Sequence, residues 1–338
     1  DTIDKKGKIL VYGDYDVDGI TSTAIMTSAL QQLGAKVEYY IPHRFSEGYG
    51  IHASTIDMLI SKKIDLLITV DCGISNINEV QQLKQLSNIK VVIMDHHNIP
   101  AKIPDADAVI NPKFLPENHP LYHLCAAGVV YKFIEFYENN YCSELSAKKF
   151  LDLVAIGTIA DIVPLIGENR RLVKLGMTQV SYQNRLGIKY LLQSAKFKNE
   201  NVSVRDVGFT IAPRLNAAGR LEHAGISVDL LLSQKEKEAE FIANKLQKMN
   251  EKRQNMGTQI FNESIKDWTK KTTTQDHNAI IMANSNWHAG IIGITASKLV
   301  DRFGRPTVLI SNNGNMARGS ARTIGDVNIY ELLKNSQH

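Results

Sequence analysis

The sequence has 338 residues, of which 43% are hydrophobic and 22% charged, with a formal net charge of +4. This length suits two domains with separate cores, and the composition is typical of a soluble globular protein. We find no apolar run long enough to cross a bilayer and no signal peptide in the opening DTIDKKGK. The cysteines, Cys72, Cys125 and Cys142, are scattered and form neither a disulfide framework nor a zinc-finger pattern. We therefore expect a cytoplasmic protein with reduced thiols, whose mild positive charge permits a polyanionic partner without requiring one.

The first half of the sequence alternates short apolar runs with helical stretches. The apolar runs that predict strands are 8–12, 37–41, 66–70, 91–94 and 108–110. Helical spacing of apolar residues predicts helices over 21–32 and 53–62. Continuously apolar strands alternating with helices are typical of a parallel sheet that is covered on both faces. The sequence therefore predicts an α/β fold for this half.

The second half predicts a different organisation. The sequence after Leu121 becomes helical, and 233–271 is rich in Lys, Glu, Gln and Asn, with apolar residues at roughly helical spacing. A second α/β unit follows, with strands at AIIMA and TVLIS around a helix over 294–301. We expect a catalytic domain over 1–232, a connecting helix over 233–271 and a smaller, partial domain over 272–338. Neither a G-x-G-x-x-G nor a P-loop signature occurs, which weighs against nucleotide-cofactor chemistry.

An acidic cluster, Asp14, Asp16 and Asp18, lies between the first strand and the first helix. Carboxylates at alternate positions converge on one side of an extended segment. Their negative charges repel one another, and bound hard divalent cations offset this repulsion. The motif opens like an EF-hand calcium loop. That loop, however, requires a Glu at its twelfth position, where this sequence has Ile25, and a helix upstream rather than a strand. The pattern therefore favours a magnesium or manganese site.

Further acids and histidines follow other strands. Asp71 follows the run 66–70, and Asp95, His96 and His97 follow the run 91–94. Asp161 lies among apolar residues in AIGTIADIVPL, where a buried acid needs a partner. Ligands of open parallel sheets gather beyond the carboxyl ends of the strands, so we expect these side chains to converge on a metal site.

The motifs DYDVDG, VDCG, DHH and ADIVPL, in that order, resemble those of the DHH phosphoesterases. The segments IPHRFSEGYGI, APRLNAAGR, SNWHAGIIGITASKL and ARGSAR resemble the RecJ branch of that family. The resemblance implies two Mn²⁺ or Mg²⁺ ions, with the ligands Asp14, Asp16, Asp18, Asp71, His96 and Asp161. It implies that Asp71 bridges the ions, that Asp95 orients a histidine, and that His97 faces the substrate phosphate. The residues it assigns to catalysis are Asp71, His96, His97 and Asp161.

Basic and polar residues outside the acidic motifs predict a binding site for a nucleic-acid backbone. Arg44 lies in a glycine-bearing loop, Arg214, Asn216 and Arg220 flank small residues, and His288 precedes a helix whose amides could receive a phosphate. Ser320 and Arg322 resemble residues that recognise a terminal 5′-phosphate. For each arginine, a surface ion pair is the alternative interpretation.

The resemblance implies hydrolysis of single-stranded DNA from the 5′ end to mononucleotides, in recombination and repair, with a helicase and a single-strand-binding protein as possible partners. Short RNA, a cyclic dinucleotide or pyrophosphate is the alternative substrate, and an inactive binding module is a third hypothesis. The family's GGH-type motif and its oligonucleotide-binding barrel do not occur in this sequence, so we expect a fragment of a longer protein.

Overall fold

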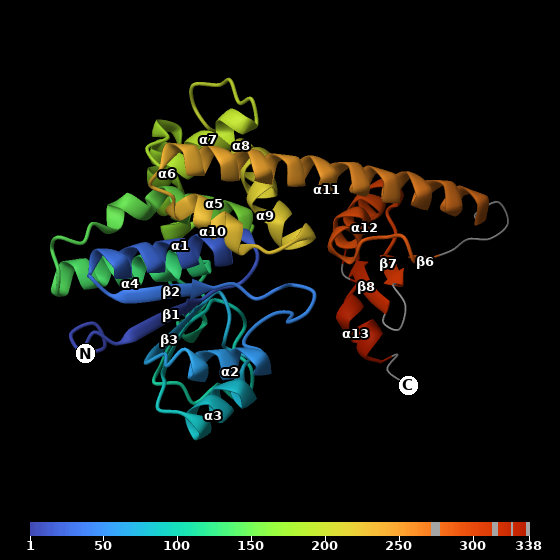
Figure 1. Cartoon of the computed structure of the whole chain (residues 1–338). Helices are drawn as coiled ribbons and strands as arrows, with labels where there is room; N and C mark the ends of the chain where they lie inside the picture. The colour runs from blue at the N-terminus through green and yellow to red at the C-terminus, as the bar shows by residue number, and fades with distance from the viewer. Residues whose placement is uncertain (272–277, 313–316, 326, 336–338) are drawn as a thin grey trace. The chain divides into compact units, whose positions relative to one another are not determined.

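The computed structural model describes residues 1–271, 278–312, 317–325 and 327–335. The chain forms two compact units, Asp1–Lys248 and Met249–His338, and the boundary falls within one long helix (Figure 1). No helix in the described part of the chain is both long enough and apolar enough to cross a membrane.

The first unit is built on a parallel sheet of five strands in the order β2-β1-β3-β4-β5. The strands are β1 (Lys8–Tyr12), β2 (Lys36–Tyr40), β3 (Leu66–Val70), β4 (Lys90–Met94) and β5 (Ala108–Ile110). Leu10 pairs with Leu67, and Leu67 pairs with Val91, so the central strands are aligned side by side. These three residues are fully buried, as expected for strands that are covered on both faces. The predicted parallel α/β sheet is confirmed.

Helices cover both faces of this sheet. Figure 1 shows α1 and α4 on one face and α2 and α3 on the other. These four helices and α5, which packs on α1, have the bounds α1 (Val17–Gln32), α2 (Ala53–Ser61), α3 (Ile77–Leu86), α4 (Ala126–Asn140) and α5 (Leu151–Ala160). α1 is buried almost all round because α4, α5 and α10 pack against it in addition to the sheet.

A helical layer completes the first unit. The short helix η1 (Pro112–Phe114) follows β5. The helical layer consists of η2 (Ala147–Phe150), α6 (Gly167–Tyr182), α7 (Leu186–Ser194), α8 (Val204–Asp206), η3 (Val207–Ile211), α9 (Ala212–Leu221) and α10 (Gly225–Leu232). α11 (Glu236–Lys271) follows and crosses the boundary between the units. A long helix was predicted over this segment, and its observed start lies three residues later than the predicted one.

The second unit has a small mixed sheet in the order β6-β7-β8. Its elements after α11 are β6 (Ile280–Asn284), α12 (Ala289–Phe303), β7 (Thr307–Asn312), β8 (Ala317–Arg322) and α13 (Ile329–Lys334). β6 pairs parallel with β7, and β8 pairs antiparallel with β7. Trp287 is buried and donates its indole N–H to Glu263 at 2.8 Å, which ties the turn before α12 to α11. Residues 272–277, 313–316, 326 and 336–338 of the predicted domain 272–338 lie outside the described residues.

Candidate metal centre

Acidic residues follow three neighbouring strands at the carboxyl edge of the first sheet. Asp14 lies two residues after β1, Asp71 directly after β3 and Asp95 directly after β4. The main-chain N–H of Asp71 donates to the carbonyl of Met94 at 3.0 Å, which continues the ladder one step past the strand. Because β1, β3 and β4 are adjacent, the side chains meet at one edge, as the strand-end argument predicts.

Asp16 and Asp18 belong to the start of α1 rather than to an extended segment. Asp16 is the N-cap and accepts a hydrogen bond from the N–H of Gly19 at 3.1 Å. Asp18 accepts from the N–H groups of Ala126 at 2.6 Å and Ala127 at 2.9 Å, at the first turn of α4. The expectation of alternate carboxylates on an extended strand end is therefore wrong, because capping begins the helix inside the motif. The carboxylates still converge, since the positive end of α4 holds Asp18 in place.

His96 lies at the centre of the cluster. Its Nε2 is 3.1 Å from Asp71 Oδ1, 3.7 Å from Asp18 Oδ2 and 3.8 Å from Asp161 Oδ2. Asp161 reaches this point because it is the C-cap of α5, which packs against α1. Four segments that are distant in the sequence thus meet around one imidazole.

The ligand atoms fall into three overlapping groups, in each of which the atoms lie within 4.8 Å of one another. The groups are Asp14 with Asp16 and Asp71, Asp18 with His96 and Asp161, and Asp71 with His96 and His97. Asp71 and His96 each belong to two groups, as residues between two neighbouring ions would. His97, which was predicted to face the substrate only, lies close enough to Asp71 and His96 to share their group.

The electrostatics of the cluster fit divalent cations. Burial and the neighbouring Asp16 raise the pKa of Asp14 to about 8, and burial with Asp18 raises the pKa of Asp161 to about 7. Burial and repulsion from the other carboxylates also raise the pKa of Asp71 far above its ordinary value. Asp14 Oδ1, Asp71 Oδ1 and His96 Nε2 are buried without a hydrogen-bond partner among the described residues. Buried polar atoms need a partner, and a bound Mn²⁺ or Mg²⁺ would provide one, because carboxylate oxygens and imidazole nitrogens are ligands for these ions.

Asp95 differs from the other acids because hydrogen bonds surround it. It is fully buried and accepts from the main-chain N–H groups of Ile74, His96 and His97 and from His97 Nδ1 at 2.7 Å. Burial alone would raise the pKa of Asp95, but these hydrogen bonds outweigh it and the pKa is lowered. Asp95 also raises the pKa of His97 against the effect of burial. The geometry agrees with a residue that orients a histidine, and that histidine is His97.

Tyr49 is a contact of the cluster that the sequence did not single out. Its hydroxyl donates to the main-chain carbonyl of Asp71 at 3.2 Å and lies 3.0 Å from His97 Nδ1. The signals in the sequence are its place in the segment IPHRFSEGYGI, which also carries Arg44, and its position between Gly48 and Gly50. The Arg44 guanidinium lies 4.7 Å from the centre of the Tyr15 ring, beside the acidic motif.

The segment APRLNAAGR forms α9 and packs against the acidic motif. A Cβ at Gly219 would lie 2.7 Å from the carbonyl oxygen of Tyr15, so only glycine allows this approach. Arg220 is close enough to affect the ionisation of Tyr15, whereas Arg214 donates to Gln247 at 2.7 Å and to the carbonyl of Thr210 at 2.7 Å. Asn216 is half-buried on the same helix. Arg214 thus has protein partners, which favours a structural role alongside the predicted substrate contact.

The remaining predicted residues belong to the second unit. His288 is the N-cap of α12 and accepts from the N–H of Gly290 at 3.1 Å. Arg322 donates to Ser320 Oγ at 3.3 Å and to the carbonyl of Ala321 at 2.7 Å. A Cβ at Gly293 would lie 2.8 Å from Ser320 Oγ, so β8 places these two side chains on the first turns of α12.

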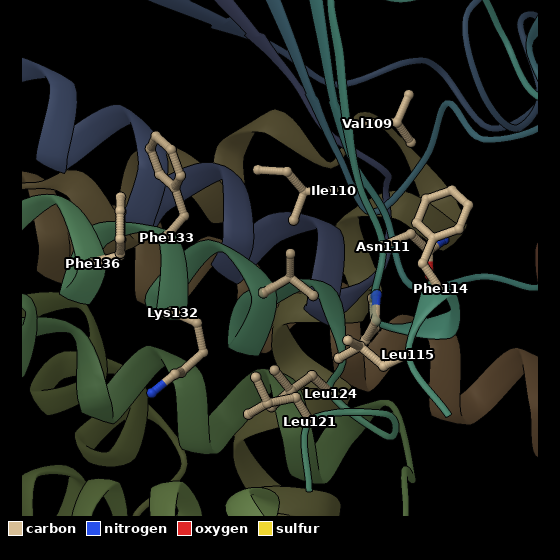
Figure 2. Close-up of a pocket in the computed structure, with 12 residues that line it drawn as sticks. Val109, Ile110, Asn111, Phe114, Leu115, Leu121, Leu124, Lys132, Phe133 and Phe136 are labelled. Atoms are coloured by element: carbon tan, nitrogen blue, oxygen red, sulfur yellow. The ribbon is translucent and has the colours of Figure 1, made fainter. Parts of the chain in front are cut away.

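A separate apolar pocket of about 570 Å³ lies between β5 and α4 (Figure 2). Figure 2 shows Ile110 extending toward Phe133, with Leu121 and Leu124 side by side in another part of the lining. The charged residue among its lining residues, Lys132, forms ion pairs with Glu135 and Glu168. The pocket contains none of the predicted site residues, and its lining does not suit phosphate chemistry.

Comparisons with known proteins agree with this geometry. A family model described as "DHH family, N-terminal domain" matches residues 8–158, and one described as "DHHA1 domain" matches residues 276–337. The chain is 40% identical over 333 residues to the single-stranded-DNA-specific exonuclease RecJ of Bacillus subtilis, covering 98% of the chain and 41% of that protein. It is 34% identical over 342 residues to the Escherichia coli enzyme of the same name, covering 97% of the chain and 59% of that protein.

Solved structures of similar proteins contain manganese. A crystal structure of exonuclease RecJ bound to manganese superposes with a TM-score of 0.83 at 32% identity, covering 98% of this chain and 82% of that one. A structure of RecJ from Thermus thermophilus in complex with Mn²⁺ gives a TM-score of 0.85 at 29% identity, covering 99% of this chain and 48% of that one. The chain spans about half the length of the curated relatives that it matches.

Proposed function

Because the chain belongs to the DHH family and, within it, to the RecJ proteins, we propose that it carries the catalytic centre of a metal-dependent exonuclease. The proposed reaction is hydrolysis of single-stranded DNA from the 5′ end, releasing mononucleotides. The observation that supports it most directly is the cluster of buried carboxylates around His96, with ligand atoms that lack hydrogen-bond partners among the described residues. The names of the relatives support the substrate, and the geometry supports the chemistry.

The ligand groups favour two ions. We assign Asp14 and Asp16 to one ion, Asp18, His96 and Asp161 to the other, and Asp71 to the position between them. The manganese in the similar solved structures supports Mn²⁺, with Mg²⁺ as the alternative. Divalent ions bound there would supply the Lewis acidity that activates water and neutralises charge developing on a phosphate.

The chain's own residues position the substrate and protons around this centre. Asp95 holds His97 through Nδ1, so the second ring nitrogen, Nε2, is left to contact a phosphate oxygen. Arg44 and Arg220 lie near Tyr15 in the acidic motif and would provide positive charge there, and Asn216 and Arg214, on the same helix as Arg220, are proposed to add hydrogen-bond donors for the substrate. In the second unit, the Ser320–Arg322 pair and His288 are proposed to hold a terminal 5′-phosphate, for which a guanidinium beside a hydroxyl is well suited.

The proposed domain organisation is a catalytic domain over 1–232, a connecting helix over 233–271 and a substrate-binding domain over 272–338. The continuous helix α11 supports the middle segment. An enzyme that requires separated strands implies a helicase and a single-strand-binding protein as partners. Free thiols at Cys72, Cys125 and Cys142 support a reducing compartment such as the cytoplasm.

End-labelled single-stranded DNA tests the proposal. With Mn²⁺, a 5′-labelled strand should release labelled mononucleotide at once, whereas a 3′-labelled strand should shorten progressively. Asp71→Ala should abolish release, because it removes the residue shared by two ligand groups. Asp105→Ala, at an exposed carboxylate paired with Lys84, is the matched control and should keep wild-type activity. Release from the 3′ end, or cleavage of short RNA or cyclic dinucleotides with the long strand left intact, would contradict the proposed substrate and polarity.

A further inference from the structure

Tyr49 is held in place by the loop that carries it. Gly48 and Gly50 both adopt left-handed backbone conformations, with φ of 82° and 81°. Tyr12 donates its hydroxyl to the carbonyl of Gly50 at 2.8 Å. Asn76 closes the other side by accepting from the N–H of Ile51 at 3.0 Å and donating to its carbonyl at 3.1 Å. The two glycines turn the chain so that the side chain between them points at the metal centre.

The hydroxyl of Tyr49 joins two residues of that centre. It donates to the main-chain carbonyl of Asp71 at 3.2 Å and lies 3.0 Å from His97 Nδ1. Since Asp95 accepts from the same His97 nitrogen at 2.7 Å, that nitrogen carries a proton and Tyr49 is its second acceptor. The result is a chain of hydrogen bonds from His97 through Tyr49 to Asp71.

The carbonyl that Tyr49 holds belongs to a constrained residue. Asp71 has φ of 63°, in the left-handed region, which few non-glycine residues adopt, although aspartate is among those that do so most readily. Its side chain is buried and belongs to two of the three ligand groups. Any change in the orientation of this peptide would move the carboxylate that both groups share.

We infer that Tyr49 is a positioning residue of the metal centre, whose hydroxyl fixes the backbone of Asp71 and the ring of His97. Tyr49 is 44% exposed, so substitutions at this position leave the buried core of the unit unchanged. The effect on turnover rests on the proposed exonuclease function, whereas the effect on metal binding does not.

Calorimetric titration of this chain with Mn²⁺ tests the metal-binding part. Tyr49→Phe removes the hydroxyl alone and should weaken Mn²⁺ binding roughly ten-fold, the effect usual for loss of a residue that orients a ligand. Tyr49→Leu should weaken it equally. Tyr131→Phe, which removes a hydroxyl bonded to Glu135 on α4, is the matched control and should bind Mn²⁺ as the wild type does. Wild-type Mn²⁺ affinity in Tyr49→Phe would overturn the inference.

Turnover tests the connection to His97. Tyr49→Phe should lower kcat on single-stranded DNA roughly ten-fold while changing KM less than about two-fold, because the hydroxyl orients groups rather than binding substrate. In a His97→Ala background the same substitution should lower kcat less than it does in the wild type, since one of the two residues it acts through is gone and only the contact with Asp71 remains. Equal losses in both backgrounds would overturn the connection to His97, and a defect in Tyr49→Leu that Tyr49→Phe lacks would show that the ring, not the hydroxyl, carries the effect. If the wild type releases no nucleotides, the proposed function fails, and the Mn²⁺ titration still decides the role of Tyr49.

Discussion

Removing the metal should invert the usual dependence of stability on pH. In the metal-free protein the pKa of Asp14 is raised to about 8 and that of Asp161 to about 7, against an ordinary value of 3.8. Between the ordinary pKa of 3.8 and the raised pKa of about 7 to 8, the folded state binds more protons than the unfolded state, so the free energy of unfolding falls as pH rises over this range. The stability that the protonated Asp14 and Asp161 carboxyls contribute is fully present below about pH 4 and is lost as pH rises through 7 to 8.

The magnitude follows from the shift. One pKa unit corresponds to about 1.4 kcal/mol, so Asp14 alone contributes on the order of 4 kcal/mol between pH 4 and pH 7. This is a large part of a net stability of about 5–15 kcal/mol. It should lower the urea midpoint by about 1–2 M, for a slope of about 2–3 kcal/mol per molar urea. Bound Mn²⁺ should reverse the trend, because ligands bind metal in their ionised form and protons compete with it.

Urea unfolding in chelator and in Mn²⁺, at pH 5 to 8, measures this effect. Both tryptophans, Trp268 and Trp287, belong to the second unit, so far-ultraviolet circular dichroism must follow the metal-binding unit. Asp14→Asn should flatten the pH dependence in chelator, whereas Asp105→Asn, at an exposed carboxylate, should leave it unchanged. A metal-free wild type as stable at pH 8 as at pH 5, or an Asp14→Asn variant with the wild-type slope, would refute the reasoning.

Three substitutions test how the helices of the first unit pack and which of these contacts support the site. Gly157→Ala should weaken Mn²⁺ binding and lower stability by about 1–3 kcal/mol, since its Cβ would lie 2.5 Å from Thr21 Oγ1 on α1. Gly187→Ala, whose Cβ would lie 2.3 Å from a carbonyl oxygen of α10, should cost similar stability in urea yet leave Mn²⁺ affinity unchanged in calorimetry. Arg185→Ala should lower the free energy of unfolding by about 3–5 kcal/mol because it leaves the buried Asp152 carboxylate unpaired; a loss below about 1 kcal/mol in urea unfolding would contradict this.

The strands and the convergence of acids could be predicted because they depend on local pattern and on parallel topology. The runs 8–12, 66–70 and 108–110 coincide with β1, β3 and β5. The acids that follow β1, β3 and β4 meet because those strands are neighbours, which the strand-end rule anticipates. Asp161 comes from a helix end that no strand pattern indicates; its apolar surroundings in AIGTIADIVPL singled it out, and the family motif ADIVPL then assigned it to the metal.

The parts that the sequence did not predict depend on capping and on long-range contacts. α1 was expected to begin at residue 21, where apolar spacing starts, but Asp16 caps it and the helix begins at Val17. β8 has no alternating apolar pattern, and its strand conformation follows from pairing with β7. Tyr49 lies in the segment IPHRFSEGYGI, but nothing in that segment predicts its contacts with Asp71 and with His97 from another strand end.

The spread of the ligands along the chain has a consequence for folding kinetics. Asp18 opens α1, Asp71 and His96 follow two later strands, and Asp161 closes α5, so the ligands around His96 assemble only after distant segments have met. Contacts between distant segments form slowly, because loop-closure entropy must be overcome before they are made. Recruitment of Mn²⁺ during refolding should therefore lag behind formation of the sheet. The rate of Mn²⁺ binding during refolding would then report when α5 packs against the rest of the unit, which is the last step of assembly.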